Sequence, residues 1–308
     1  MNKLSIIIPV YNEAESMPPL FEELAKLEPR LLEHDFEMEL IFVDDGSHDA
    51  SLAQLLKFKD SRPGTSIIKL SRNFGAIHAT KVGLAKVTGD CFTVLSADLQ
   101  DPPELILEMI ERWRAGSKFV IFTRQQRQDP LLSRVFAALY YKLLRRFVVP
   151  GFPAGGYDLS VMDRSLLPHL NQSGKNINLA LFAFWLGFDP EIMYYTRQKR
   201  RFGKSKWTFS RKFTFFLDSI LGFSFLPIRL ISLIGVIVSL VSFTYGTIMV
   251  IYTLTGHSDL PGYPTLVSLI SFLLGLVIIM LGVIGEYVWR IFDEINHRPE
   301  SVIDEIYD

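Results

Sequence analysis

Residues 92–106 read FTVLSADLQDPPELI, an apolar run of strand length that ends on the carboxylates Asp98 and Asp101. A buried strand that stops on acidic side chains predicts either a cap for the next helix or a cation-binding site at the edge of a sheet. Asp101 fits the first role, because Asp-Pro-Pro-Glu places it at an N-cap, with Pro102 in the first turn and Glu104 in a capping box. Asp98 lies before that cap, at the strand end, and we expect it to bind a ligand.

Asp98 and Gln100 together offer oxygen ligands of the kind that Mg²⁺ and Mn²⁺ prefer. The stretch holds too few such ligands to enclose an ion with protein atoms alone. Phosphate oxygens of a bound molecule would have to complete the coordination. The sequence therefore indicates a divalent cation shared with a diphosphate.

Apolar runs of strand length alternate with helical stretches through the first part of the chain. The runs lie at residues 4–11, 38–47, 65–71, 91–98 and 118–124. Such alternation predicts an α/β domain with a mostly parallel sheet covered by helices on both faces. Ligands of these sheets bind outside the carboxyl ends of the strands. No glycine-rich phosphate loop follows the first run, which argues against a dinucleotide or P-loop site.

The distribution of charge divides the chain into a polar part and an apolar part. The 308 residues are 49% hydrophobic and carry a formal net charge of -1, so no strong positive field points to nucleic acid. Charged residues are frequent up to about residue 212 and nearly vanish from 230 to 285, which predicts a membrane part after a polar domain. The single cysteine, Cys91, suits a reducing compartment.

Two apolar runs, residues 230–255 and 265–289, are long enough to cross a membrane. At about 1.5 Å per residue, the first exceeds the roughly 30 Å hydrocarbon core of a bilayer. The alternative, two buried core helices, is disfavoured by this length. The connection between the runs holds no Lys or Arg, whereas Arg229 and Arg290 flank their outer ends. The positive-inside rule then places the large domain and the C-terminal tail, residues 290–308, in the cytoplasm.

Small residues recur along one face of each apolar run. They are Gly235, Ser239, Ser242 and Gly246 in the first run, and Ser268, Ser271, Gly275, Gly282 and Gly285 in the second. Such faces let helices approach closely in lipid, either within one chain or between chains. A homo-oligomer is one outcome of this pattern.

Two further segments have the composition of membrane-surface segments. Residues 197–212 hold eight basic side chains and no acid, and they lead into a juxtamembrane amphipathic stretch at 211–229. A solvated loop is the ordinary interpretation of such a run, but basic residues beside aromatic ones also suit anionic headgroups. Residues 133–149 combine a basic stripe with an apolar one, which fits an interfacial helix and a core-facing helix equally well.

Five motifs in order make the chain resemble a known family. IIIPVYNE (6–13), FVDDGS (42–47), SADLQDPPE (96–104), GGYD (155–158) and RRFGKSKW (200–207) resemble those of family-2 glycosyltransferases of the GT-A fold. The two apolar runs make the chain most similar to the membrane-anchored polyprenyl-phosphate branch, which includes bactoprenol glucosyltransferases and dolichyl-phosphate mannose synthases. The Asp-Ala-Asp of that family is here Ser96-Ala97-Asp98. One metal-side carboxylate is therefore missing, which weakens metal binding or shifts the load to Gln100.

The resemblance implies roles for individual residues. Nucleotide contacts are expected at Pro9, Tyr11, Glu13, Asp44, Ala97 and Asp98. The resemblance also implies Mg²⁺ or Mn²⁺ on Asp98 and Gln100, and the diphosphate or lipid phosphate on Arg124, Arg200 and Lys206. Asp158 would be the catalytic residue on the acceptor side. For Asp158, a turn acid after two glycines and a partner for Arg164 remain alternatives.

The expected protein is therefore a membrane-anchored enzyme with a cytosolic GT-A domain at residues 1–210. It would transfer a sugar, glucose as first choice, from a UDP-sugar to a polyprenyl phosphate with inversion, at the cytoplasmic face of a bacterial inner membrane. A GDP-mannose-dependent polyprenyl-phosphate mannosyltransferase is one alternative. A catalytically silent membrane scaffold or sugar-nucleotide sensor is another, because Ser96 departs from the family motif.

Overall fold

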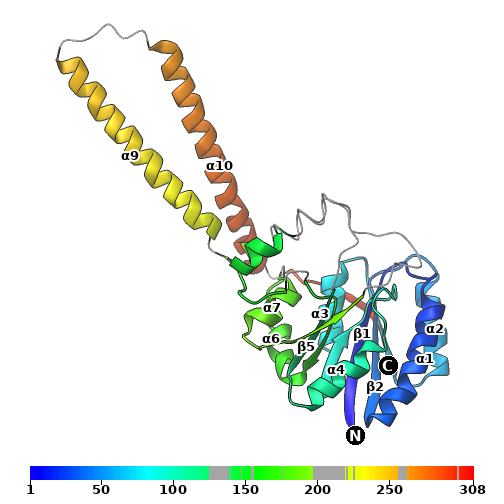
Figure 1. Cartoon of the computed structure of the whole chain (residues 1–308). Coiled ribbons are helices and arrows are strands. Elements are labelled where there is room, and N and C mark those ends of the chain that lie inside the picture. Colours follow the sequence, from blue (N-terminus) through cyan, green and yellow to red (C-terminus); the bar gives the residue numbers. More distant parts are fainter. Residues whose placement is uncertain are drawn as a thin grey trace. The chain divides into compact units, whose positions relative to one another are not determined.

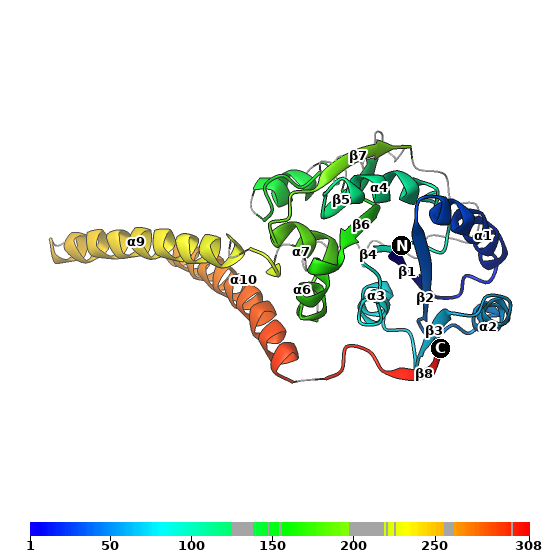
Figure 2. The same ribbon diagram turned by 90° about the horizontal axis from the view of Figure 1, so that it is seen from below.

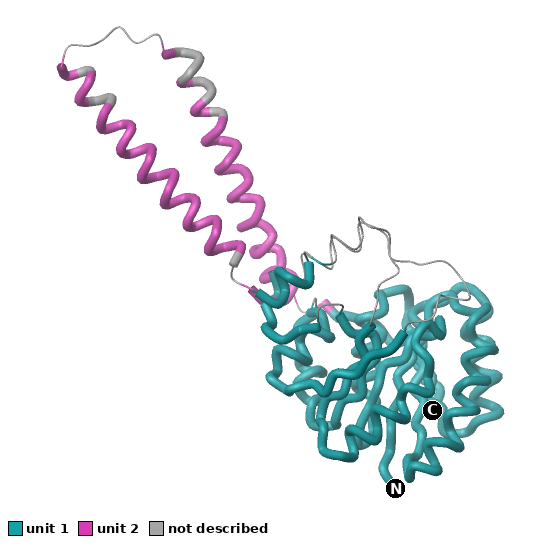
Figure 3. The backbone as a smooth tube through the Cα atoms, viewed as in Figure 1, with its two compact units in different colours: residues 1–222, 299–308 teal, residues 223–298 magenta. Residues whose placement is uncertain are grey.

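The chain folds into two compact units in the computed structural model, residues 1–222 with 299–308, and residues 223–298 (Figure 3). The described residues are 1–124, 138, 140–146, 148–153, 156–175, 177–196, 219, 221–224, 226–255, 262–296 and 298–308. The basic run 197–212, with Arg200 and Lys206, lies outside them, as do parts of the expected segments 133–149 and 211–229.

The first unit is built on one eight-stranded sheet in the order β7-β5-β6-β4-β1-β2-β3-β8 (Figure 2). Its strands are β1 (Asn2–Val10), β2 (Phe36–Asp44), β3 (Thr65–Leu70), β4 (Cys91–Val94), β5 (Phe119–Arg124), β6 (Leu159–Asp163), β7 (Glu191–Tyr195) and β8 (Ile303–Tyr307). Only β6 and β8 run against the other strands of this sheet. The predicted mostly parallel α/β fold is confirmed.

Helices cover both faces of this sheet because alternate strand residues point to opposite sides. They are α1 (Met17–Glu33), α2 (Ser51–Ser61), α3 (Ala76–Leu84), α4 (Leu105–Arg114), the short 3₁₀ helix η1 (Arg164–Leu166), α6 (Leu167–Asn171) and α7 (Leu179–Trp185). Helix α3 approaches its face closely: a Cβ on Gly83 would lie 2.4 Å from Cγ2 of Ile7. Glycine at that position therefore lets the helix pack against β1.

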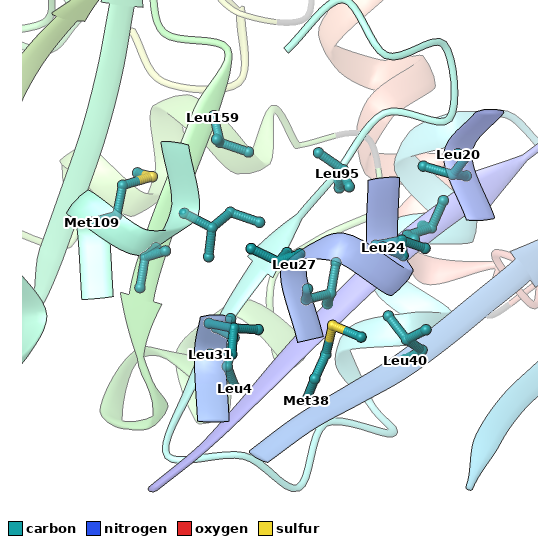
Figure 4. Packing of buried hydrophobic residues seen from close by; sticks show 14 of the residues in the cluster. Leu4, Leu20, Leu24, Leu27, Leu31, Met38, Leu40, Leu95, Met109 and Leu159 are labelled. Carbon is teal, nitrogen blue, oxygen red and sulfur yellow. The ribbon is translucent and has the colours of Figure 1, made fainter. Parts of the chain in front are cut away.

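The main core lies between the sheet and the helices α1 and α4. Leucines recur at helical spacing along α1, so that one stripe of the helix faces the sheet. Figure 4 shows this stripe, Leu20, Leu24, Leu27 and Leu31, beside Leu4, Met38 and Leu40 of the strands. All seven side chains are at most 5% exposed. Burial at about 25 cal/mol per Å² makes this core the main source of stability for the unit.

The second unit consists of two long apolar helices, α9 (Leu226–Leu254) and α10 (Tyr263–Ile295), which lie side by side (Figures 1 and 2). Pro227–Ile248 and Phe272–Ile295 are long and apolar enough to cross a membrane, and within this unit their side chains are exposed. The expected spans, 230–255 and 265–289, coincide with these helices apart from their ends. Helix α10 continues to Ile295.

The last residues, expected to form a cytosolic tail, are part of the sheet. Ile303–Tyr307 forms β8, which pairs antiparallel with β3 at one edge (Figure 2). Glu300 attaches the segment before β8 to helix α3, because its carboxylate accepts a hydrogen bond from Nζ of Lys81 at 2.6 Å. Lys81, on α3, also donates to the Ser173 carbonyl at 2.9 Å. The N-terminal and C-terminal parts of the chain therefore share one folded unit.

Candidate active site

Polar side chains gather at the edge of the sheet where its parallel strands end. They are Tyr11 and Glu13 after β1, Asp44 at the end of β2, Asp98 after β4, and Arg124 at the end of β5. Because β6 runs in the opposite direction, its beginning lies at the same edge and brings Asp158 there. Most of these residues thus follow the end of a parallel strand, and Asp158 precedes the start of the antiparallel strand β6. All of them lie along the same edge of the sheet.

The end of β2 carries two buried carboxylates. Asp44 is 0% exposed; its Oδ2 accepts a hydrogen bond from the Ser47 backbone at 3.2 Å, whereas Oδ1 has no partner among the described residues. Burial raises the pKa of Asp44, although the Ser47 hydrogen bonds oppose this effect. Asp45 accepts from the backbone N–H groups of Phe74 and Gly75, at 2.7 and 2.8 Å, and so holds the β3–α3 loop.

The loop after β1 is tied to the loop after β2. Asn12 has a left-handed backbone (φ 49°), and its Oδ1 accepts from the His48 N–H at 2.8 Å while its own N–H donates to Ser47 Oγ at 3.0 Å. Pro9 and Val10 pair in register with Val43 and Asp44. The expected nucleotide residues of β1 and β2 therefore belong to one corner of the sheet, where hydrogen bonds join the two loops.

The loop after β4 presents the Asp98 carboxylate, which is 8% exposed. Asp98 Oδ1 accepts hydrogen bonds from the Ser96 hydroxyl at 3.0 Å and from the Gln100 N–H at 3.2 Å. Leu99 between them adopts a left-handed backbone (φ 54°), which is unfavourable for a residue with a side chain. Such strain persists only where surrounding contacts impose it, and it is often found at functional sites.

This loop fits a hard divalent cation in the type of its donors. Asp98, Gln100 and Ser96 supply carboxylate, amide and hydroxyl oxygens, which suit Mg²⁺ and Mn²⁺. Within the described ranges, no group of three or more His, Cys, Asp or Glu side chains converges to hold a metal. Mg²⁺ held by one or two protein carboxylates commonly takes further oxygens from a bound phosphate.

Arg124 and Asp158 are joined in an ion pair. Arg124 Nε donates to Asp158 Oδ2 at 2.5 Å and Nη2 donates to Oδ1, with the two side chains 20% and 14% exposed. Burial alone would lower the Arg124 pKa, but the hydrogen bonds and charge of Asp158 raise it above its ordinary value. The guanidinium stays charged. Arg164, the partner considered from the sequence, instead reaches the Thr88 carbonyl at 3.4 Å.

Asp101 is not a helix cap, and that prediction is wrong. Helix α4 begins at Leu105 with Glu104 in the N-cap position, after a turn in which Leu105 N–H donates to Pro102 O at 3.1 Å. The Asp101 carboxylate is instead buried, 4% exposed, and accepts a hydrogen bond from the Tyr195 hydroxyl. The turn at the two prolines delays the start of the helix to Leu105, and the Asp101 carboxylate is buried beside Tyr195.

Tyr195 is a site residue that sequence reasoning missed. Its hydroxyl lies 3.1 Å from Asp158 Oδ2 as well as in contact with Asp101. The signal that could have found it is the alternation in EIMYY, residues 191–195, where Met193 and Tyr195 are buried and Ile192 and Tyr194 are exposed. That period of two predicts a strand ending on Tyr195.

Comparison with known proteins assigns this arrangement to a family. A profile described as glycosyl transferase family 2 matches residues 5–170, more than half of the chain. The chain belongs to glycosyl transferase family 2. It is 36% identical to an uncharacterized glycosyltransferase of Synechocystis sp., over 99% of this chain and 96% of that protein.

Two other relatives of this glycosyltransferase carry more specific names. A bactoprenol glucosyl transferase of Shigella phage SfV is 34% identical over 98% of both chains. A prophage bactoprenol glucosyl transferase homolog of Escherichia coli K12 is 32% identical over 99% of both. The similarity therefore extends over the α/β unit and the two apolar helices alike.

Family membership makes the substitution at Ser96 informative. The Ser96 hydroxyl donates a hydrogen bond to Oδ1 of Asp98. A carboxylate at position 96 would instead repel this oxygen. Ser96 therefore supplies a hydrogen-bond donor to Asp98 without adding a negative charge of its own. The other expected phosphate ligands of this glycosyltransferase, Arg200 and Lys206, lie outside the described residues.

Proposed function

We propose that this glycosyltransferase transfers a hexose, glucose as first choice, from a UDP-sugar to a polyprenyl phosphate with inversion. The observation that carries the proposal is the similarity, over almost the whole chain, to relatives named bactoprenol glucosyl transferase. The two apolar helices supply a reason for a lipid acceptor, because the reaction must occur where a soluble nucleotide meets a membrane. A GDP-mannose donor remains the alternative within the same chemistry.

The reaction is a single displacement. An oxygen of the acceptor phosphate attacks the anomeric carbon of the sugar, and the bond from that carbon to the nucleoside diphosphate breaks with its electron pair on the leaving oxygen. A phosphate monoester has a second pKa of about 6, so at neutral pH the acceptor is largely a dianion and needs little proton abstraction. Asp158 then orients the acceptor or removes a residual proton, and Arg124 stabilises phosphate charge.

The nucleotide would occupy the corner formed by β1, β2 and β4, with Pro9, Tyr11, Glu13, Asp44 and Ala97 around it. A buried carboxylate oxygen without a hydrogen bond is unfavourable by about 1–3 kcal/mol. An N–H group of the nucleotide base would satisfy Asp44 Oδ1. Because Asp44 is fully buried, the loops that cover it have to move when the nucleotide binds.

Charge at the sheet edge supports a role for Mg²⁺ or Mn²⁺. Asp98, Asp101 and Asp158 contribute three carboxylates, and Arg124 forms an ion pair with Asp158. Carboxylates repel an anionic diphosphate. A divalent ion held by Asp98 and Gln100 would neutralise both the carboxylates and the departing diphosphate.

We also propose that the catalytic unit and both chain ends are cytoplasmic, and that α9 and α10 cross the bacterial inner membrane. The sheet supports the placement of both chain ends on the same side of the membrane. Strand β8 follows α9 and α10 in the chain, and it pairs with β3 of the catalytic unit. The test uses a membrane-impermeant thiol reagent on inverted and right-side-out vesicles. Cys91 is buried and gives little background, so Asp308→Cys is expected to react only in inverted vesicles and Ser258→Cys only in right-side-out ones.

The activity test uses the full-length protein, purified in detergent, with radiolabelled sugar nucleotides and a polyprenyl phosphate. We expect label from UDP-glucose to enter the lipid phase in the presence of Mg²⁺ or Mn²⁺. Faster transfer from GDP-mannose would replace the proposed donor. Binding of a sugar nucleotide without transfer to any lipid phosphate would favour the scaffold or sensor alternative. An Asp98→Asn variant serves as the inactive control.

A further inference from the structure

The Tyr195 hydroxyl lies between two carboxylates that come from different parts of the fold. Tyr195 is the last residue of β7, and in the sheet register it is the neighbour of Arg124 in β5. Its hydroxyl donates to Asp101 and lies 3.1 Å from Asp158 Oδ2. One side chain therefore contacts both the Arg124–Asp158 pair and the loop that follows β4.

That loop carries the expected metal residues and is held in a strained conformation. Leu99 has a φ of 54°, and Asp98 and Gln100 flank it. A left-handed backbone at a leucine relaxes unless neighbouring contacts oppose the relaxation. The Tyr195–Asp101 hydrogen bond is such a contact, since Asp101 is only 4% exposed and belongs to the same loop.

The aromatic ring makes Tyr195 a rigid support. It packs edge-on against Phe122, with ring centroids 5.7 Å apart and an interplanar angle of 69°. A tyrosine has few rotatable bonds, so its hydroxyl position is set once the ring is packed. The hydroxyl carries one hydrogen and can donate it to only one carboxylate at a time, which couples Asp101 to Asp158.

We infer that Tyr195 is a positioning residue for sugar transfer, which holds the Asp98 loop in place against the Arg124–Asp158 pair. The inference rests on the proposed function, because it takes Asp98 as the donor side of the site and Asp158 as the acceptor side. Tyr195 touches neither substrate in this role. It sets the distance between the two groups that bind them, and small errors in such a distance slow a reaction strongly.

The test is Tyr195→Phe in the full-length protein, which keeps the packed ring and removes the hydroxyl. We expect kcat to fall by about tenfold or more, while KM for the lipid acceptor changes by less than about threefold. The assay uses whichever sugar nucleotide and lipid phosphate the wild-type protein turns over fastest. If the proposed donor or acceptor is wrong, the wild-type protein will turn over a different substrate fastest. The kcat values of the variants can still be compared with that substrate.

Two matched tyrosines separate positioning from general stability. Tyr194→Phe makes the same chemical change on the neighbouring residue, whose side chain is 62% exposed, and kcat should stay at the wild-type value. Tyr157→Phe removes a hydroxyl that donates to the Ala180 carbonyl at 3.2 Å, outside the Asp101–Asp158 network. It should lower Tm about as much as Tyr195→Phe but leave kcat within about threefold of wild type. A loss of kcat in Tyr157→Phe equal to that in Tyr195→Phe overturns the inference.

A double variant tests whether Tyr195 acts through Asp101. If it does, the loss in Tyr195→Phe/Asp101→Asn is close to that of the more damaged single variant, because both changes break one connection. A loss equal to the product of the two single losses means that the residues act independently and overturns the inference. Wild-type kcat in Tyr195→Phe overturns it directly.

Discussion

Arg124 ends β5 and Asp158 directly precedes the adjacent strand β6, and the guanidinium of the first donates two hydrogen bonds to the carboxylate of the second. Asp158 N–H also donates to the Phe122 carbonyl of β5 at 3.2 Å, so the backbone positions the pair as well. The expected base and the expected phosphate ligand are thus partners before any substrate binds. A phosphate that reaches Arg124 competes with Asp158 for the same N–H groups. Phosphate binding would therefore weaken the hydrogen bonds between Arg124 and Asp158.

The first prediction concerns the stability of this ion pair. Arg124→Ala leaves the Asp158 carboxylate, 14% exposed, without its charged partner and should lower the free energy of unfolding by about 2–3 kcal/mol. The double variant Arg124→Ala/Asp158→Ala should be less destabilised than Arg124→Ala, since it leaves no buried charge. Denaturant or thermal unfolding of the purified proteins measures the difference. Equal stability of the single and double variants would contradict a buried pair. Each variant should lose most of its transfer activity.

The second prediction concerns Ser96. Ser96→Asp replaces a hydroxyl donor to Asp98 by a second carboxylate, so the protein should be less stable in EDTA and should bind Mn²⁺ more tightly. The thermal shift on adding Mn²⁺ should therefore exceed that of the wild type. Ser96→Ala, which removes the donor without adding charge, is the control and should not show the larger shift. Complete loss of activity with unchanged Mn²⁺ binding would mean that Ser96 has another role.

The third prediction follows from the burial of Asp44. Because its folded-state pKa is raised above the ordinary value of 3.8, the proton binds the folded state more tightly. The contribution of Asp44 to stability is thus present below about pH 4 and is lost as the pH rises through the folded-state pKa. Asp44→Asn does not titrate, so its Tm relative to wild type should be higher at pH 7.5 than at pH 4.5. The same variant should bind the sugar nucleotide more weakly. An unchanged difference in Tm between the two pH values would refute the burial argument.

A fourth prediction concerns the C-terminal attachment. Glu300→Gln removes the charge that faces Lys81, whose side chain is 10% exposed, and should destabilise the catalytic unit by about 1 kcal/mol. The control is Glu23→Gln, which breaks the exposed pair with Lys26 and should change stability by less than about 0.5 kcal/mol. Equal effects of the two variants would mean that the attachment of the C-terminal segment does not depend on Glu300.

The fifth prediction concerns association of the apolar helices. Gly235 lies near its neighbouring helix, because a Cβ there would be 3.1 Å from the Met280 methyl group. A Cβ on Gly275 or Gly282 would meet nothing within 4 Å among the described residues. These two glycines are available to a second chain, so Gly275→Leu/Gly282→Leu should shift the detergent-solubilised protein toward the monomer. Light scattering measures the mass, and an unchanged mass would remove the case for association through this face.

Local patterns were sufficient for the parallel strands and for the apolar helices. The strands at residues 4–11 and 91–98 are apolar runs bounded by polar residues, and the edge at which their ends meet follows from parallel direction alone. Asp44, Asp98 and Arg124 could therefore be placed together in advance. The apolar helices were predictable because length and lack of charge suffice to identify such segments.

The sequence by itself determined that this protein joins an α/β glycosyltransferase unit to a pair of membrane-length helices, with acids at the ends of its strands. Only the tertiary structure decided that Asp158 pairs with Arg124, that Tyr195 reaches Asp101, and that Ile303–Tyr307 completes the sheet. The reason is physical. Residue spacing encodes local periodicity, whereas contacts between segments far apart in the chain depend on which strands become neighbours and on which buried polar groups must find partners.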